Sequence, residues 1–186
     1  MSQIILASQS PRRKQLLEWA EISFDIIVAD TDESFPGTLM PEDVAMHIAM
    51  GKARAVQQRA PGTIIIAADT IVVLKDEIIG KPVDRNDAIN ILNKLSGTHH
   101  KVITGVVILQ NEKTMSFTDS TDVEFHPLTL TQIEFYVDNY KPYDKAGAYA
   151  IQEWIGVVGI KCINGDFYNV MGLPVSRVVR ELQNFR

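Results

Sequence analysis

Residues 63–74 read TIIIAADTIVVL, and this run decides the class of fold. An almost unbroken run rich in isoleucine and valine is typical of a central strand that is covered on both faces. One acid, Asp69, interrupts it. Because an unpaired carboxylate there is costly, Asp69 must reach water, bond to neighbouring N–H groups, or bind a metal or activate a water. The structural interpretation stays open, although the end of a strand in an open α/β sheet favours a function.

Helix and strand patterns alternate around this run, and hairpins accumulate later in the chain. Strands are predicted at 3–7, 22–30, 63–74, 100–109 and 114–125, a hairpin at 156–171, and helices at 11–20, 41–60, 84–97, 131–140 and 173–185. Thr131 and Glu134 suit a capping box at the start of the fourth helix. The order predicts an α/β fold with a mixed central sheet and flanking helices. Residues 1–186 are expected to form one domain, with two tightly joined lobes left open.

Composition excludes several classes of protein. The chain has 186 residues, is 46% hydrophobic and carries a formal net charge of -5, which argues against a nucleic-acid-binding protein. Its single cysteine, Cys162, allows no internal disulfide and predicts a cytoplasmic protein. Cys162 falls in an apolar strand pattern and is expected in the core. The N-terminal apolar run is too short for a secretory signal, and no segment is expected to span a membrane.

The helix predicted at 11–20 begins with Ser10, a preferred N-cap, and Pro11, which suits the first helical position. Arg12 and Arg13 therefore fall in the first turn, where the helix end itself carries partial positive charge. Two guanidinium groups at such an end suit a phosphate. The alternative is that both side chains simply point into water.

Three further charged residues are candidates, each with an ordinary explanation beside the functional one. Glu33 lies in an acidic loop that is usually just solvated, but with Asp69 it could hold a hard cation such as Mg²⁺. Lys52 borders the apolar stripe of the helix at 41–60 and could be a lysine with only its stem buried. Lys81 follows a glycine at a strand end, where lysines are commonly solvated.

Seven segments occur in the order seen in one known family. They are LASQSPRRKQLL (6–17), GKARAV (51–56), AADTIVVL (67–74), GKP (80–82), LSGTHHKVITGV (95–106), DKAGAYAIQ (144–152) and NVMGLP (169–174). Over almost its whole length the chain therefore resembles the Maf family of nucleoside triphosphate pyrophosphatases. DKAGAYAIQ is similar to the branch that acts on dTTP and UTP, and the branch that acts on 7-methyl-GTP departs from it.

The resemblance implies roles for the residues that match. Asp69 matches the proton acceptor, and Arg12, Thr70 and Gln152 match positions linked to substrate choice. The polar set on the substrate side comprises Ser8, Arg13, Glu33, Lys52 and Lys81. The family is similar in fold to inosine-triphosphate pyrophosphatases, which implies an elongated, two-lobed α/β protein with a cleft, commonly a homodimer.

These roles predict a reaction. Phosphate is expected to contact Ser8, Arg12, Arg13, Lys52 and Lys81, and the cations would stabilise the departing pyrophosphate. A divalent metal cation (Mg²⁺, Mn²⁺ or Co²⁺) is expected as cofactor, held by Asp69 and Glu33 together with phosphate oxygens. Water would attack the α-phosphorus while Asp69 accepts its proton, which gives a nucleoside monophosphate and pyrophosphate.

Base selection has a chemical basis as well. Uracil and thymine present N3–H and O4 side by side, and the Gln152 amide offers an acceptor and a donor to match them. Glu153 and Trp154 stand where relatives often have a small residue, which predicts an altered pocket rim. The alternatives are a sibling pyrophosphatase for 7-methyl-GTP and a non-catalytic nucleotide-binding regulator of cell division. Neither nucleic acid nor membrane is an expected partner.

Overall fold

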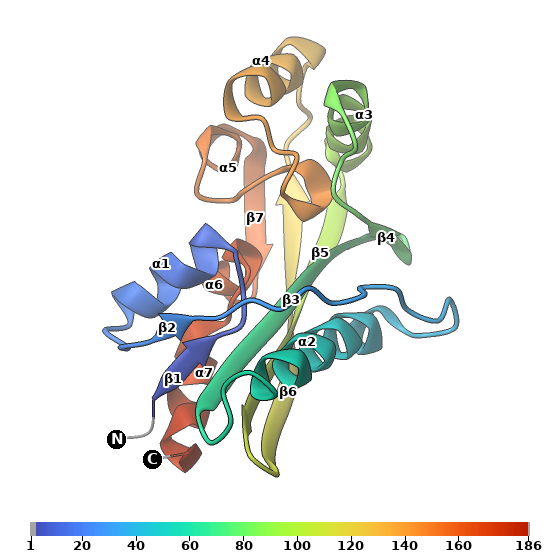
Figure 1. Ribbon diagram of the computed structural model, residues 1–186. Helices are drawn as coiled ribbons and strands as arrows, with labels where there is room; N and C mark the ends of the chain where they lie inside the picture. The colour runs from blue at the N-terminus through green and yellow to red at the C-terminus, as the bar shows by residue number, and fades with distance from the viewer. Residues whose placement is uncertain (1–2, 186) are drawn as a thin grey trace. The chain divides into compact units, whose positions relative to one another are not determined.

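The computed structural model describes residues 3–185, and a sheet with helices packed along it is its framework (Figure 1). The strands are β1 (Ile4–Leu6), β2 (Asp25–Ile26), β3 (Ile64–Leu74), β4 (Glu77–Ile79), β5 (His99–Gln110), β6 (Lys113–Phe125) and β7 (Ile160–Asn164). Within the described residues they form one seven-stranded sheet in the order β2-β1-β3-β5-β6-β7, with β4 paired to β3. β1 pairs in parallel with β2 and β3, whereas β3–β4 and β6–β7 are antiparallel. The predicted α/β class with a mixed sheet is confirmed.

Helices make up most of the remaining regular structure. They are α1 (Pro11–Trp19), α2 (Pro41–Gln57), α3 (Arg85–Leu95), α4 (Leu130–Tyr140), α5 (Trp154–Gly159), α6 (Phe167–Met171) and α7 (Val175–Leu182), with 3₁₀ turns η1 (Ala146–Ala148) and η2 (Gln183–Phe185). None of the helices between residues 3 and 185 has the length and apolar character needed to cross a membrane.

The chain divides into two units that are each discontinuous in sequence. The first unit comprises residues up to 70, 104–119 and the chain from 172 onward, and the second comprises 71–103 and 120–171. Strands β3, β5 and β6 contribute residues to both units. Because the division cuts through strands and not through a linker, composition and linker signals give no sign of it.

The first unit has a core built from small residues on α2 and branched residues on the strands. Ala49 and Ala53 of α2 are fully buried against Ile65 of β3 and Val107 of β5. Alanine on the inner face lets the helix approach the sheet closely, and Gly105 of β5 lies opposite the helix backbone. This packing carries Lys52, which lies on α2 next to Ala53, to the same unit as Asp69.

The second unit has an aromatic core around His100. The rings of Phe125 and Tyr149 lie edge-on to that of His100, with centroids 5.2 and 5.5 Å away. Nε2 of His100 shares a hydrogen bond of 2.8 Å with the Tyr149 hydroxyl. Burial, and then the charge of His99, lowers the pKa of His100 to about 4, so the ring is neutral at pH 7. No residue at metal-ligand spacing accompanies this histidine in the sequence, and in the structure it is a buried core residue.

The predicted hairpin at 156–171 is wrong. Those residues form helix α5, one strand and helix α6, and only β7 joins the sheet. The carbonyl of Glu153 accepts the N–H groups of Gly156 and Val157, and the Asp166 carboxylate accepts that of Tyr168, so each helix gains a starting bond. The expectation that Cys162 is buried is wrong too: it lies on β7, which ends the strand order, and is exposed.

Two element starts also differ from the prediction. The capping box of α4 is formed by Thr129 and Gln132, two residues before the predicted pair, because Leu130 and not Thr131 begins the helical hydrogen bonding. The strand predicted at 22–30 shortens to Asp25–Ile26, since only Ile5 and Leu6 of β1 lie opposite it.

Candidate active site

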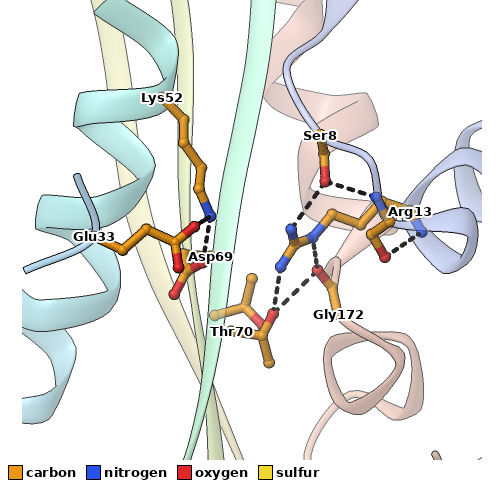
Figure 2. A network of polar contacts seen from close by, with 9 residues as sticks. Ser8, Arg13, Glu33, Lys52, Asp69, Thr70 and Gly172 are labelled. Atoms are coloured by element: carbon orange, nitrogen blue, oxygen red, sulfur yellow. Dashed lines mark hydrogen bonds and ion pairs between the residues drawn. The ribbon is translucent and has the colours of Figure 1, made fainter. Parts of the chain in front are cut away.

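Lys52 joins two carboxylates in the first unit. Its Nζ lies 2.7 Å from Oδ1 of Asp69 and 2.8 Å from Oε1 of Glu33, and Figure 2 shows both carboxylates pointing to it. The Lys52 and Asp69 side chains are 18% and 15% exposed, against 48% for Glu33. Lys52 and Asp69 are thus mostly withdrawn from water, while Glu33 reaches Lys52 from the solvent side. Sequence alone did not establish that these three residues meet.

Asp69, Lys52 and Glu33 lie on a strand, a helix and a loop, respectively. β3 is buried along its length except at Asp69 and Thr70, which are half-buried. Lys52 sits one turn after the buried Ile48 on α2, so its stem follows the apolar stripe and its ammonium reaches β3. Glu33 lies in the irregular segment between β2 and α2. The charge interrupting the central strand is therefore paired, as a buried carboxylate requires.

Arg13 lies at the centre of a second network in the same unit. Its Nε donates to the Gly172 carbonyl at 2.7 Å, Nη1 to the Ser8 hydroxyl at 3.1 Å, and Nη2 to the Thr70 hydroxyl at 2.9 Å (Figure 2). Thr70 shares a further 2.9 Å bond with the hydroxyl of the fully buried Thr104. Arg13 thus ties the β1–α1 connection, β3 and the segment before α7 together beside Asp69.

The two arginines of the first helical turn therefore have different surroundings. Ser10 caps α1, as predicted, by accepting the N–H of Arg13, and Pro11 begins the helix. Arg13 is only 8% exposed, whereas Arg12 is half-buried. Burial lowers the pKa of the Arg13 guanidinium, with Arg12 adding to that direction and the charges of Asp69 and Glu33 opposing it. A guanidinium remains protonated at pH 7, so the fold holds a nearly buried positive charge here.

The second unit holds the two remaining predicted site residues. Lys81 follows Gly80 after β4 and is exposed. Gln152 is also exposed, between the buried Ile151 and the half-buried Glu153. Of the predicted site residues, the structure thus brings Ser8, Arg13, Thr70, Lys52, Asp69 and Glu33 into the two networks of the first unit, and it places Lys81 and Gln152 outside them.

Sequence reasoning missed two members of the Arg13 network. They are Thr104 and the Gly172 carbonyl. Both lie in segments that carry the family resemblance, LSGTHHKVITGV and NVMGLP, which was the available signal. A buried threonine and a backbone carbonyl have no pattern of their own that marks a site.

Asp69 and Glu33 are the residues expected to bind a metal. Asp69 and Glu33 each present a carboxylate oxygen to one point, which the Lys52 ammonium marks with its two contacts. Nowhere between residues 3 and 185 do three or more His, Cys, Asp or Glu side chains gather to hold a metal. Mg²⁺ is commonly bound by one or two carboxylates plus substrate phosphates and water, so the residue types fit such an ion, which would have to displace the Lys52 ammonium from between them.

Comparison with known proteins gives the chain its relatives. A family model described as Maf-like protein matches residues 3–185. The dTTP/UTP pyrophosphatase of Cytophaga hutchinsonii is 53% identical over 180 residues, which cover 97% of this chain and 83% of that protein. The dTTP/UTP pyrophosphatase of Parabacteroides distasonis is 46% identical over 184 residues, covering 98% and 95%.

Among solved structures, the Staphylococcus aureus Ham1 protein is similar with a TM-score of 0.48 at 15% identity. The match covers 66% of this chain and 71% of that one. The assignment of the fold rests on the strand pairing described above and not on this likeness.

Proposed function

The chain belongs to the Maf family, and we propose that it hydrolyses dTTP and UTP to the nucleoside monophosphate and pyrophosphate. Relatives of that activity match it over nearly its whole length, which supports the proposal. The observation that carries it is the Asp69 carboxylate, held on β3 by an ion pair with Lys52 in an otherwise apolar strand. A carboxylate fixed in this way suits a proton acceptor.

Asp69 and Lys52 have separate roles in the proposed hydrolysis. A water attacks the α-phosphorus, the new P–O bond forms, and the bond from that phosphorus to the bridging oxygen breaks to release pyrophosphate. Asp69 takes the proton of the attacking water. Lys52 places a positive charge beside Asp69 and beside the charge that develops on phosphate. We assign Asp69 as the catalytic residue on this basis.

Phosphate binding is assigned to the cations predicted from the sequence. A guanidinium has five N–H groups, and three of those of Arg13 donate to Gly172, Ser8 and Thr70. Within residues 3–185 the other two N–H groups of Arg13 make no such bond, and we propose that they donate to a phosphate oxygen. Arg12 adds a second guanidinium at the N-terminus of α1, where the backbone also favours an anion. Lys81 is proposed as a further phosphate contact, as predicted from the sequence.

A divalent cation such as Mg²⁺ is proposed to bind Asp69 and Glu33. When bound, it would polarise the phosphoryl group and neutralise charge on the substrate. Glu33 has the more exposed side chain of the two, at 48%, and so is the residue through which an ion would enter. We further propose that the protein acts as a homodimer in the cytoplasm and needs neither nucleic acid nor membrane.

Pyrophosphate release from a panel of nucleoside triphosphates, with and without Mg²⁺ or Mn²⁺, tests the proposal. We expect metal-dependent cleavage of dTTP and UTP, and a loss in Asp69→Asn of roughly 10²–10⁴-fold in kcat. Asp76→Asn is the matched control, because Asp76 is an exposed turn residue with a φ of 69° that asparagine adopts readily. Cleavage confined to 7-methyl-GTP would overturn the base assignment. Binding without cleavage of any nucleotide would favour the regulator, and an Asp69→Asn enzyme with full turnover would remove Asp69 from the chemistry.

A further inference from the structure

Gln152 lies in a segment of the second unit that hydrogen bonds and an ion pair hold in place. We propose that Tyr136 and Glu153 are positioning residues that fix the backbone at Gln152 and so set how tightly the enzyme binds UTP. This inference rests on the proposed function and on the prediction from the sequence that Gln152 recognises the pyrimidine edge. The Gln152 side chain is exposed, and within the described part of the chain its amide makes no hydrogen bond that could orient it.

The Tyr136 hydroxyl bonds to the chain on both sides of Gln152. Tyr136 lies on α4 and is fully buried. Its hydroxyl donates to Oε2 of Glu153 and accepts the backbone N–H of Ala150 at 3.1 Å. One phenol oxygen therefore fixes a residue two before Gln152 and the residue directly after it. With Ile151 only 4% exposed, the backbone that carries Gln152 has little freedom.

A lysine balances the charge of Glu153. Nζ of Lys145 lies 3.6 Å from Oε1 of Glu153 and 2.7 Å from the Asp144 carboxylate. The Lys145 side chain is only 9% exposed, so this charge is kept close to its partners with little water between them. Charged groups withdrawn from water need such pairing, and the pair joins the two ends of the segment 145–153.

The backbone between these ends is strained, which shows how strongly its surroundings define it. Gly147 has a φ of 70° and Ala148 a φ of 58°, the second in a region that residues other than glycine rarely adopt. A Cβ on Gly147 would lie 2.9 Å from Cγ2 of Val72. The N–H of Gly147 donates to the Gly80 carbonyl at 3.1 Å. Strained backbone persists where surrounding structure over-determines it, and it is often found at functional sites.

Together these contacts make the segment a rigid support for the Gln152 side chain. The Gln152 amide can pair with N3–H and O4 of uracil only where its backbone holds it within hydrogen-bonding distance of that edge. A support that holds Gln152 in place before the nucleotide arrives lowers the ordering cost of binding. Loss of the support should therefore raise KM for UTP and leave the proton transfer to Asp69 unaffected.

The experiment compares kcat and KM for UTP in the full-length enzyme and four variants. Tyr136→Phe deletes only the hydroxyl, Glu153→Ala deletes its partner, and Glu153→Gln keeps an acceptor for Tyr136. Tyr140→Phe is the matched control, since Tyr140 stacks on Tyr136 from the same helix at 5.0 Å but is 38% exposed. We expect Tyr136→Phe and Glu153→Ala to raise KM for UTP by roughly 3–10-fold, with kcat nearly unchanged. Glu153→Gln should keep KM near that of the wild type, and Tyr140→Phe should match the wild type.

Coupling to Gln152 separates positioning from a merely structural role. In Gln152→Ala the contact between the amide and the base is already lost, so adding Tyr136→Phe should raise KM no further. If the variants lower thermal stability or kcat but leave KM for UTP unchanged, the network is structural and the inference fails. Additive losses in the double variant would also overturn it. A wild-type enzyme that does not cleave UTP would instead refute the proposed function, and the inference with it, before any variant is measured.

Discussion

Gly105→Ala tests the close packing that places Lys52 beside Asp69. Gly105 lies in the middle of β5, opposite α2. A Cβ there would lie 2.6 Å from the carbonyl carbon of Ala45 and 2.7 Å from its oxygen and from the N of Met46. All three are backbone atoms, so no side chain can rotate away. The shortest contact falls about 0.8 Å below the 3.4 Å at which ordinary van der Waals contact begins.

The magnitude follows from what must move. Helix and strand have to separate by a good part of that shortfall, and gaps of 0.5–1 Å forfeit about a quarter to a half of the dispersion energy of the facing atoms. Overpacking a core usually costs about 1–3 kcal/mol, and backbone against backbone belongs at the upper end. We therefore expect the free energy of unfolding to fall by about 3 kcal/mol, and Tm by about 6–12 °C for a chain of this length. Activity should fall too, because Lys52 is carried on α2.

Urea unfolding followed by circular dichroism measures the effect, with Gly51→Ala as the matched control. Gly51 lies on the exposed side of the same helix, and a Cβ there would meet nothing within 4 Å. Alanine is a better helix former than glycine, so this variant should gain up to about 1 kcal/mol. The reasoning would be refuted by a Gly105→Ala protein within about 0.5 kcal/mol of wild type, or by equal shifts in the two variants.

Two further predictions concern stability in the second unit. His100 is neutral in the folded protein because burial lowers its pKa to about 4, whereas an unfolded histidine titrates near 6.5. The unfolded state alone then binds this proton between those values, so stability should fall by up to roughly 3 kcal/mol as the pH drops from 7 to 4. His100→Phe should flatten that part of the curve of unfolding free energy against pH, and an unchanged slope would contradict the assignment. Thr129→Ala removes the cap of α4 and should lower the free energy of unfolding by about 1 kcal/mol, while Thr131→Ala should have little effect. Chemical denaturation of both variants decides between the two threonines, because the reverse order would support the capping box expected from the sequence.

The sequence by itself determined the framework of this protein. The run at 63–74 predicts a central strand because β-branched side chains favour it locally, and β3 occupies Ile64–Leu74. The Ser10–Pro11 pair marks the start of α1 through local capping chemistry. The carboxylate of Asp69 stood out because its burial cost is a property of the residue and its neighbours in sequence. Seven segments in order were enough to predict the family, and the family match confirms it.

Tertiary structure decided what depends on contacts between distant residues. Local propensity favoured a hairpin at 156–171, but Ile160–Asn164 pairs with β6, far earlier in the chain, and not with a second strand beside it. No spacing in the sequence places Lys52 between Asp69 and Glu33, since the three come from a helix, a strand and a loop. Arg12 and Arg13 look alike in the chain, yet only folding buries one of them among Ser8, Thr70 and Gly172. The physical reason is the same in each case: capping and burial preferences act over a few residues, whereas the pairing of charges and the environment of each side chain are set by packing between elements far apart in the chain.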